Sequence, residues 1–251
     1  MDNGWVFLVG KDGEKIFKKI EGDRIHTHKG FIQVDDLKGK GKGSVVRTNK
    51  GYPFIISSPT IDDFILHLAK RKTQVVYPKD AGYIVMKLSP FPGAKVLEGG
   101  TGSGVMASIF AWFVGSNGKV YSFEKRRDFV DLARENLRIL GLEDRVEIIE
   151  GDLSNNLDIE LVDMVFLDVK EPWLVIENVF KYLKDSSPFS ILVPTFNQVK
   201  KTLDALKDLP VFDLNVVEIL ERFYKVNPER LRPVDRMVAH TGFLIFGRKG
   251  S

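Results

Sequence analysis

One stretch constrains the fold of this chain more than any other, and it runs from Ala94 to Gly104 as Ala-Lys-Val-Leu-Glu-Gly-Gly-Thr-Gly-Ser-Gly. Val96 and Leu97 are typical of the end of a buried strand, and the apolar run Val105–Val114 predicts a packed helix. A strand, a glycine-rich turn and a helix form the first unit of a nucleotide-binding α/β sheet. The alternative is a glycine-rich turn with a packing role alone.

The spacing of the glycines favours one class of ligand. Glu98 and three glycines fall at every second position, whereas the dinucleotide fingerprint G-x-G-x-x-G requires a different spacing, which Val105 breaks. The pattern fits a turn whose backbone approaches the methionine end of S-adenosylmethionine (SAM), a ligand without a pyrophosphate. The predicted cofactor is therefore SAM, and its predicted contacts in this turn are Gly100, Thr101, Gly102, Ser103, Gly104 and Val105.

From residue 94 onward, predicted strands and helices alternate. Further strands are expected at 119–124, 145–150, 161–167 and 190–194, with helices at 126–140, 171–183 and 199–209. Segments 212–220 and 241–246 are expected to close the sheet as a hairpin pair. This order predicts an α/β fold with a doubly wound, mostly parallel seven-stranded sheet that carries an antiparallel C-terminal strand.

The first 93 residues have a different pattern. Residues 1–57 contain six short predicted strands and a basic loop with Lys38, Lys40 and Lys42, which predicts a small, barrel-like antiparallel β-module. Residues 58–93 are expected to form a connecting helix, capped by Thr60, and a loop. Residues 70–80 mix cations, an amide, a phenol and a carboxylate without a period, so they are predicted to be a loop that carries function or a charged connector.

Composition excludes several classes of chemistry. The chain has no cysteine, which excludes disulfides, thiolate catalysis and cysteine-bound zinc. His26 and His28 alternate on a predicted strand, where a solvated edge explains them better than a metal does. The longest apolar run is about ten residues, too short for a bilayer, and the first residues do not resemble a signal peptide. We therefore expect a cytoplasmic protein with no metal and no membrane partner.

The charge distribution is asymmetric along the chain. Residues 1–90 hold 16 Lys and Arg against 10 Asp and Glu, whereas the remaining residues hold 21 against 24. This asymmetry favours a basic front module that binds a polyanion, and an ordinary solvated surface is the alternative. Near the C-terminus, Arg232 and Arg236 precede a predicted buried strand, where they would clamp phosphate near the mouth of the site or belong to a solvated basic loop.

Three acids follow successive predicted strands at the edge where α/β sheets bind ligands. We expect Glu124 to bind ribose hydroxyls and Asp152 to accept from the adenine amino group, with Leu153 beside it in the same site. Asp168 would face the reaction centre, and a helix cap is the alternative role for it. Three acids at successive strand tips beside a glycine turn favour a nucleoside site.

Taken together, several motifs closely resemble one family, the TrmI-type tRNA (adenine-N1)-methyltransferases that act on the T-loop. The resembling segments are 73–80, 98–104, 122–126, 167–173 and 232–242, and with the N-terminal module they span nearly the whole chain. The glycine motif is shared by many SAM enzymes, whereas Tyr-Pro-Lys-Asp at 77–80 and Arg-Met-x-x-His-Thr-Gly at 236–242 are far more specific. The chain departs from the family at Val169-Lys170, where Leu-Pro is common.

The resemblance implies a class I SAM-dependent methyltransferase, a homotetramer, that methylates N1 of adenosine 58 in tRNA, with purine 57 as a further target in archaeal-type members. It implies that Asp168 is the essential acid and that Tyr77 packs against the extruded adenine. The remaining substrate contacts that we predict are Gln74, Arg232, Arg236 and His240.

Three other functions compete with this interpretation. A SAM-dependent methyltransferase of protein isoaspartate or of a small molecule would keep the glycine turn and Glu124 but would need neither residues 77–80 nor a basic module. A non-catalytic tRNA-binding subunit would be expected to lose the glycines and Asp168, which are present. An NAD-dependent reductase is disfavoured by the glycine spacing.

Overall fold

The computed structural model describes residues 4–68, 70 and 74–251 of the 251-residue chain. These residues form two compact units, which comprise residues 1–69 and 70–251. Arg71, Lys72 and Thr73, which belong to the predicted loop and to the start of one family motif, lie outside the described residues.

The first unit consists of short antiparallel strands around a small apolar core. A four-stranded sheet has the order β2-β1-β6-β5, and a separate two-stranded sheet pairs β3 with β4. The strands are β1 (Trp5–Gly10), β2 (Lys15–Lys19), β3 (Arg24–Thr27), β4 (Gly30–Gln33), β5 (Val45–Arg47) and β6 (Pro53–Ser57), and a 3₁₀ turn, η2, spans Val34–Leu37. Leu8, Ile32 and Phe54 are buried together, so both sheets contribute to one core. The small antiparallel module that the alternating pattern predicts is confirmed, as two sheets around one core.

A short helical segment follows the module within the same unit. Thr60 caps it, as predicted: the Thr60 hydroxyl accepts from the Asp63 backbone, and the Asp63 carboxylate accepts from the Thr60 backbone. The α-helical part is only α1 (Ile61–Asp63), and it continues as a π-helical turn, η3 (Phe64–Leu68). Lys15 Nζ on β2 lies 2.5 Å from the Asp63 carboxylate, so an ion pair ties this segment to the module.

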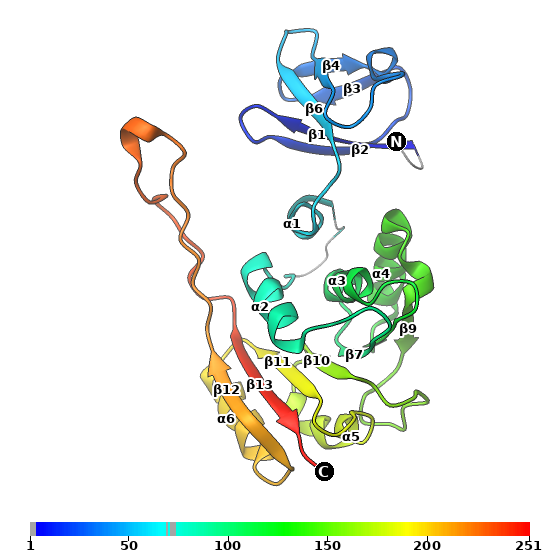
Figure 1. Cartoon of the computed structure of the whole chain (residues 1–251), viewed down its shortest axis with the longest axis vertical. Helices are drawn as coiled ribbons and strands as arrows, with labels where there is room; N and C mark the ends of the chain where they lie inside the picture. Colours follow the sequence, from blue (N-terminus) through cyan, green and yellow to red (C-terminus); the bar gives the residue numbers. More distant parts are fainter. Residues whose placement is uncertain (1–3, 69, 71–73) are drawn as a thin grey trace. The chain divides into compact units, whose positions relative to one another are not determined.

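The second unit is built on a seven-stranded sheet with the order β12-β13-β11-β10-β7-β8-β9 (Figure 1). The strands are β7 (Lys95–Gly99), β8 (Lys119–Glu124), β9 (Val146–Glu150), β10 (Met164–Leu167), β11 (Pro188–Val193), β12 (Val211–Val217) and β13 (Phe243–Lys249). Strands β9, β8, β7, β10 and β11 are parallel, and β13 runs antiparallel to both of its neighbours. The predicted α/β fold, with its antiparallel C-terminal strand, is therefore confirmed.

Helices cover both faces of this sheet. Figure 1 shows α2, α3 and α4 on one face and α5 and α6 on the other. The helices are α2 (Pro78–Leu88), α3 (Val105–Val114), α4 (Arg127–Leu140), α5 (Ile176–Phe180) and α6 (Phe196–Leu206), and 3₁₀ turns lie at η4 (Glu143–Arg145), η5 (Pro172–Leu174) and η6 (Pro228–Arg230). No helix among the described residues is long and apolar enough to cross a membrane.

Two predictions about helices were wrong in part. Residues 70–80 were expected to be a loop, but α2 begins at Pro78, and Asp80 is buried in its first turn. The single helix expected at 171–183 is instead η5 followed by the short α5. The interruption lies at Val175, whose φ angle of −119° departs from helical geometry and which both ends η5 and begins α5.

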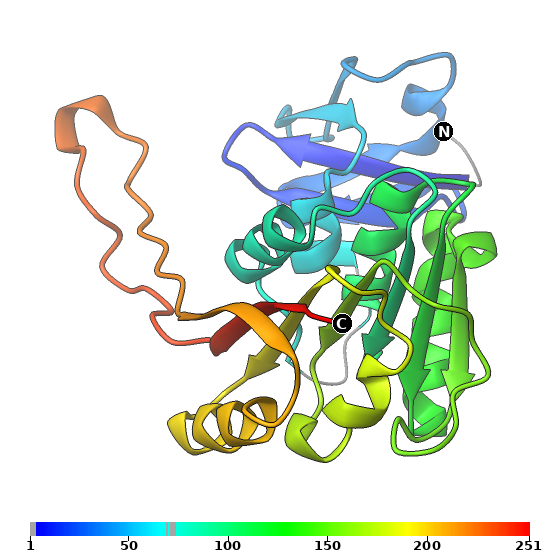
Figure 2. The ribbon, with the colours of Figure 1, turned by 60° about the horizontal axis from the view of Figure 1, so that its bottom comes forward.

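Strands β12 and β13 pair as the predicted hairpin, but residues 218–242 between them form a long excursion. We call these residues the arm. Figures 1 and 2 both show the arm projecting beyond the sheet from the ends of β12 and β13. It is held to itself by a bridge between Tyr224 and Pro233 and by a hydrogen bond from Val234 N to Phe223 O.

Candidate functional site

The carboxyl ends of the central strands bring the predicted site residues to one edge of the sheet. Strand register sets Gly99 beside Phe123 on β8 and beside Leu167 on β10. The residues that follow these strand ends, Gly100, Glu124 and Asp168, therefore start from neighbouring positions. Backbone hydrogen bonds hold this arrangement, since Asp168 N donates to Gly99 O at 2.8 Å and Gly100 N donates to Phe123 O at 2.9 Å.

A cavity of about 500 Å³ opens at this edge, and we call it the larger cavity. Its lining combines four acids, three basic side chains and apolar side chains from the loops after β8, β9 and β10. These residues include Gly100, Phe123, Glu124, Asp152, Leu153, Asp168, Leu174 and Val175. The structure thus brings together Glu124, Asp152, Leu153 and Asp168, which were predicted from separate segments.

Glu124 is bound to the glycine turn through its carboxylate. Gly102 N donates to Glu124 Oε2 and Arg126 N donates to Glu124 Oε1, each at 3.0 Å. Each carboxylate oxygen has a further lone pair, so the side chain is fixed in orientation and can still accept from two adjacent hydroxyls.

Asp152 is held as a charged group at the cavity wall. The Lys125 ammonium lies 2.7 Å from Asp152 Oδ2, and Ser154 N donates to Asp152 Oδ1 at 2.9 Å. The Lys125 and Ser154 hydrogen bonds lower the pKa of Asp152 to about 2. Asp152 therefore only accepts hydrogen bonds at neutral pH, and Lys125 is a contact that sequence reasoning missed.

Asp168 differs from Asp152 because its carboxylate has no hydrogen-bond or ion-pair partner among residues 4–68, 70 and 74–251. Asp168 is exposed to the open space of the cavity, and the walls of the cavity partly desolvate its carboxyl group. This desolvation raises the pKa of Asp168 to about 6. Within the described part of the chain, Asp168 is thus a carboxylate without a partner at the wall of the site, where a cationic ligand group would stabilise its charge.

The backbone of the glycine turn passes directly over Asp168. A Cβ at Gly100 would lie 2.1 Å from the Asp168 carbonyl oxygen, and the φ angle of Gly100 is +89°. Both the close approach and the left-handed conformation require glycine at this position. The backbone of the glycine turn therefore packs directly against the backbone of Asp168.

A smaller cavity, of about 30 Å³, shares Gly100 and Asp168 with the larger one. It is lined by the glycine turn (Gly100–Ser103), Val105, Glu98 and Phe166, and by the segment 74–76 that precedes α2. Gln74 Nε2 donates to Tyr77 Oη at 3.1 Å, so Tyr77 is joined to a lining residue but does not itself line the cavity. Gly100 and Asp168 line both cavities.

Glu98 is a buried acid of this site that the predictions did not include. It is 1% exposed on β7, and Ser122 Oγ donates to Glu98 Oε2. The Ser122 hydroxyl lies 2.6 Å from the Thr101 hydroxyl, which connects Glu98 to the glycine turn. Burial raises the pKa of Glu98 to about 8, and the nearby Asp168 and Glu124 charges add to this effect. The alternating spacing that includes Glu98 was the only sequence signal for it.

Asn136 is a second residue that sequence reasoning missed. It is 1% exposed on α4, and its Nδ2 donates to Ser103 O at 2.8 Å and to Lys70 O at 3.0 Å. The Asn136 side chain therefore ties the glycine turn to the backbone just before the segment 74–76. A lone asparagine on the apolar face of a predicted helix was its signal.

The C-terminal residues predicted to bind substrate lie apart from the two cavities. Arg232 and Arg236 are exposed on the arm, and Arg232 NH1 lies 2.5 Å from Asp235 Oδ1. His240 lies at the root of the arm, where Nδ1 is 2.6 Å from Glu218 Oε1 and Nε2 is 2.8 Å from Pro194 O. The Glu218 hydrogen bond, with that to Pro194, raises the pKa of His240. None of these three side chains lines either cavity.

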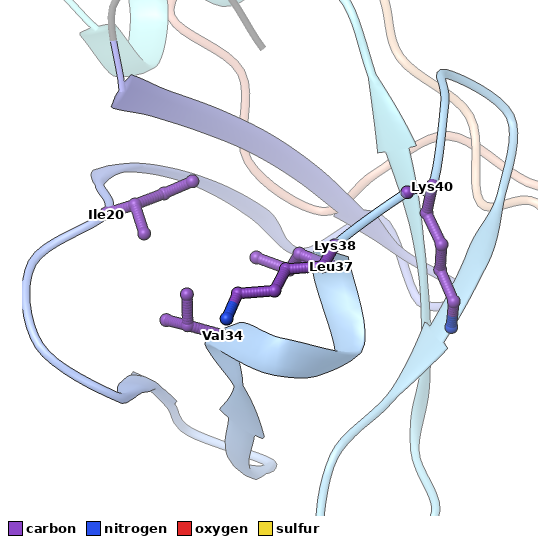
Figure 3. Close-up of a pocket in the computed structure, with 6 residues that line it drawn as sticks. Ile20, Val34, Leu37, Lys38 and Lys40 are labelled. Atoms are coloured by element: carbon purple, nitrogen blue, oxygen red, sulfur yellow. The ribbon is translucent and has the colours of Figure 1, made fainter.

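The N-terminal unit has a cavity of its own, of about 300 Å³ (Figure 3). Ile20, Val34 and Leu37 supply apolar lining, and the basic loop supplies Lys38 and Lys40. In Figure 3, Lys38 extends beside Val34, whereas Lys40 points away. The Lys38 ammonium lies 2.7 Å from Asp35, so part of the loop charge is compensated.

The described part of the chain contains no group of three or more His, Cys, Asp or Glu side chains that could hold a metal ion. The site is instead composed of carboxylates, a glycine turn and apolar walls, which is the composition expected of a pocket for a small organic ligand.

Comparisons with known proteins agree with this geometry. A family model described as the GCD14 subunit of a tRNA methyltransferase complex matches residues 51–240. A tRNA (adenine(57)-N(1)/adenine(58)-N(1))-methyltransferase, TrmI, from Methanocaldococcus jannaschii is 32% identical, and the match covers 97% of this chain and 94% of that protein.

Two solved structures are similar over the whole chain. A SAM-dependent O-methyltransferase from Thermotoga maritima is 42% identical with a TM-score of 0.93, covering 100% of this chain and 95% of that one. The tRNA (m1A58) methyltransferase TrmI from Aquifex aeolicus is 36% identical with a TM-score of 0.86, covering 100% and 99%. These comparisons confirm the resemblance seen in the motifs, and the chain belongs to the TrmI and GCD14 family of SAM-dependent tRNA methyltransferases.

Proposed function

We propose that this protein transfers a methyl group from SAM to N1 of adenosine 58 in the T-loop of tRNA, with the purine at position 57 as a further candidate target. One observation carries the proposal: Asp168 and Gly100 line both cavities. A donor that lies in the larger cavity, with its methionine end reaching past Gly100 toward the smaller cavity, would therefore present its methyl group beside an acid that has no partner among the described residues.

The larger cavity fits SAM in size and chemistry. Glu124 presents two fixed oxygens for the ribose hydroxyls, Asp152 accepts from the adenine amino group, and Phe123 and Leu153 supply apolar walls. Of the glycine turn, Gly100 lines the larger cavity, whereas Thr101, Gly102, Ser103 and Val105 line the smaller one, so the methionine end would extend toward the smaller cavity. When bound, SAM supplies an electrophilic methyl group on a positively charged sulfur.

Adenine chemistry suits the role that we assign to Asp168. The N1 lone pair of neutral adenine forms the new N–C bond while the C–S bond breaks and its electron pair goes to sulfur, so no strong base is required. The product, 1-methyladenosine, is a cation. A fixed carboxylate near the adenine amino group stabilises this charge where it develops, which is the form of catalysis that depends most on preorganisation.

We assign the segment before α2 to the target base. Adenine N1 is hidden in the folded T-loop, so the base has to be extruded to react. Gln74 lines the smaller cavity and is bonded to the Tyr77 hydroxyl, which orients the phenol. Tyr77 packs against the extruded adenine, and Gln74 supplies a polar contact at its edge.

Docking of the rest of the tRNA is assigned to basic groups outside the cavities. Lys38, Lys40 and Lys42 are exposed on the module of residues 1–57, and Arg232 and Arg236 are exposed on the arm. Such cations contact phosphates and position RNA without reading its sequence. His240, with both ring nitrogens bonded inside the protein, would contact RNA as a cation at the root of the arm.

Copies of the chain assemble through the arm, as a homotetramer. The arm exposes a concentration of large apolar side chains, among them Leu220, Phe223, Tyr224, Val226 and Leu231. Monomeric proteins rarely expose contiguous apolar patches of this kind, and homo-oligomers bury them in symmetric contacts.

The test of the proposed function is the chemical identity of the product. Transcript tRNA is incubated with the protein and methyl-labelled SAM, digested to nucleosides and analysed by mass spectrometry. Labelled 1-methyladenosine is the expected product. Label on an oxygen atom of a nucleoside, which would match the description of the Thermotoga relative as an O-methyltransferase, or no label in tRNA, would contradict the proposal.

A further inference from the structure

The first turn of α2 contains a buried cluster that neither cavity includes. Lys79 and Asp80 have side chains that are 5% and 2% exposed, and Lys79 Nζ lies 2.9 Å from Asp80 Oδ1. Charged side chains are almost never buried so completely unless they are paired. The two residues belong to the Tyr-Pro-Lys-Asp motif, which the proposed chemistry uses only through Tyr77.

The partners of this pair come from both ends of the arm. Lys79 Nζ donates to Ile219 O at 2.7 Å and to Thr241 Oγ1 at 2.5 Å. Thr241 Oγ1 in turn donates to Asp80 Oδ2 at 2.6 Å. All three N–H groups of the Lys79 ammonium, and the hydroxyl hydrogen of Thr241, therefore donate hydrogen bonds. Side chains of the first turn of α2 thus hold the two ends of the arm together.

A second set of bonds fixes the same root from the other side. His240, next to Thr241, is bonded to Glu218, next to Ile219, and to Pro194 O after β11. Two adjacent residue pairs therefore form the root of the arm. Glu218 and His240 are bonded to each other and to the end of β11, whereas Ile219 and Thr241 are bonded to the first turn of α2.

The same turn of α2 leads directly to the smaller cavity. Tyr77 is the N-cap of α2, and its carbonyl accepts from Asp80 N at 3.0 Å and Ala81 N at 2.8 Å. Gln74, Val75 and Val76, which line the smaller cavity, precede Tyr77 without a break. A displacement of Lys79 and Asp80 would therefore move Tyr77 and the wall of the cavity with them.

We propose that Lys79, Asp80 and Thr241 are positioning residues, which hold the segment Gln74–Tyr77 over the smaller cavity and make its geometry depend on the root of the arm. The proposal rests on the proposed function for its kinetic consequence. It also gives a physical role to two motifs, at 77–80 and 240–242, that lie about 160 residues apart in sequence and share one buried hydrogen-bond network.

Thr241→Val is the variant that tests this role. It keeps the shape of the side chain and removes the hydroxyl, while Lys79 and Asp80 still pair with each other. Replacing either charged residue would leave its buried partner unpaired and risk misfolding. Thr241→Ser restores the hydroxyl and is the rescue variant. Thr202→Val is the matched control, since Thr202 is 0% exposed on α6 and its hydroxyl donates to Gln198 O, away from the site.

The expected result separates positioning from stability. With saturating SAM, Thr241→Val should lower kcat/KM for tRNA by about tenfold to 10²-fold, the range for a small misplacement of reacting groups, with the Kd of SAM unchanged. Thr241→Ser should be within about twofold of the unsubstituted protein, and Thr202→Val should lower the Tm without changing kcat/KM. If Thr241→Val lowers only the Tm, as the control does, the cluster is merely structural and the proposal is wrong.

A readout without tRNA keeps the two proposals separable. In hydrogen exchange, the amides of Asp80 and Ala81 and those of the arm should lose protection together in Thr241→Val and regain it together in Thr241→Ser. Independent behaviour of the two segments would overturn the positioning role, whatever the methylation assay shows. Should the unsubstituted protein methylate no tRNA while the two segments still change together, the proposed function fails and the structural coupling stands.

Discussion

Asp168 and Glu98 are carboxyl groups of the same site that the fold holds in different protonation states. The pKa of Asp168 is raised to about 6 and that of Glu98 to about 8, in both cases chiefly by burial. At neutral pH, Asp168 is therefore mostly charged and Glu98 mostly neutral. Keeping the two acids in different states concentrates the negative charge at Asp168, where we propose that the product cation forms.

Replacing Asp168 with Asn should remove this charge and keep the shape of the side chain. We expect single-turnover methyl transfer at saturating SAM to fall by about 10²–10³-fold, the scale for loss of one electrostatic stabiliser. In the unsubstituted protein, the rate should fall as the pH drops below about 6, because Asp168 then takes up a proton. The Asp168→Asn rate should be low and lack this dependence.

The contribution of Asp168 to the stability of the fold should change with pH in the opposite direction to the rate of methyl transfer. Because the pKa of Asp168 rises from 3.8 to about 6 on folding, its contribution to the free energy of unfolding is fully present below about pH 4 and is lost as the pH rises through 6. Asp158→Asn, at an exposed carboxylate that lines neither cavity, is the control for the change in net charge. Near-normal transfer by Asp168→Asn would show that charge stabilisation is the wrong account.

At the scale of elements, the turn between β7 and α3 sets the position of the site. Gly100 is the point where two elements touch, because its Cα faces the carbonyl oxygen of Asp168 after β10. A side chain there would separate β7 from β10 at the edge where their carboxyl ends meet.

We predict that Gly100→Ala lowers both stability and SAM affinity. The positive φ angle costs about 1–2 kcal/mol in any L-residue, and the clash with a backbone carbonyl adds to this cost. Gly141→Ala is the control, because Gly141 ends α4 at a φ of +65° with nothing within 4 Å of the added Cβ. It should lose about 1–2 kcal/mol in urea unfolding and bind SAM normally in calorimetry. Equal SAM affinities in the two variants would refute the proposed role of Gly100.

Elements with a strong local period could be predicted from the sequence. The strand at 119–124 and the helix at 105–114 occur at the predicted residues, and the helix predicted at 126–140 begins one residue later. The helix α2 could not be predicted, because Lys79 and Asp80 make its first turn look like a solvated loop. Lys79 and Asp80 neutralise each other, and their further hydrogen-bond partners, Ile219 and Thr241, are 140 or more residues away in sequence and meet them only in the folded unit.

The site could be predicted in part for a similar reason. Acids that follow strands can be assigned to one sheet edge from strand order alone, so Glu124, Asp152 and Asp168 were found together. Glu98 was not included, since a buried acid within a strand gives no sign of which side chain satisfies it. Arg232 and Arg236 were predicted to lie either near the mouth of the site or in a solvated basic loop, and the structure has them exposed on the arm, apart from both cavities, because no local pattern encodes where a long excursion ends.

For the whole molecule, the distribution of charge suggests where RNA would bind. Residues 1–57 hold 11 Lys and Arg against 7 Asp and Glu. Lys38 forms an ion pair with Asp35, whereas Lys40 and Lys42 are exposed in the same loop without an ion-pair partner among the described residues. This loop is therefore the part of the module that is best able to contact phosphate.

Replacing Lys38, Lys40 and Lys42 with Gln should weaken tRNA binding and leave SAM binding unchanged. Bound lysines release counterions from the nucleic acid, so the slope of log affinity against log salt should become shallower by roughly 2 in the variant. The control replaces Lys200, Lys201 and Lys207, three exposed lysines on or next to α6, with the same change in net charge. Identical salt slopes for the two triple variants would rule out docking by this loop.

The central claim is that this site methylates N1 of one adenine in the tRNA T-loop, and one measurement tests it most directly. Two tRNA transcripts that differ only at position 58, adenosine in one and guanosine in the other, are incubated with the protein and methyl-labelled SAM, and the label is mapped by mass spectrometry of nuclease fragments. The account predicts 1-methyladenosine at position 58 of the first transcript and no label at position 58 of the second. Equal labelling of both transcripts outside positions 57 and 58, or labelling of neither, would contradict it.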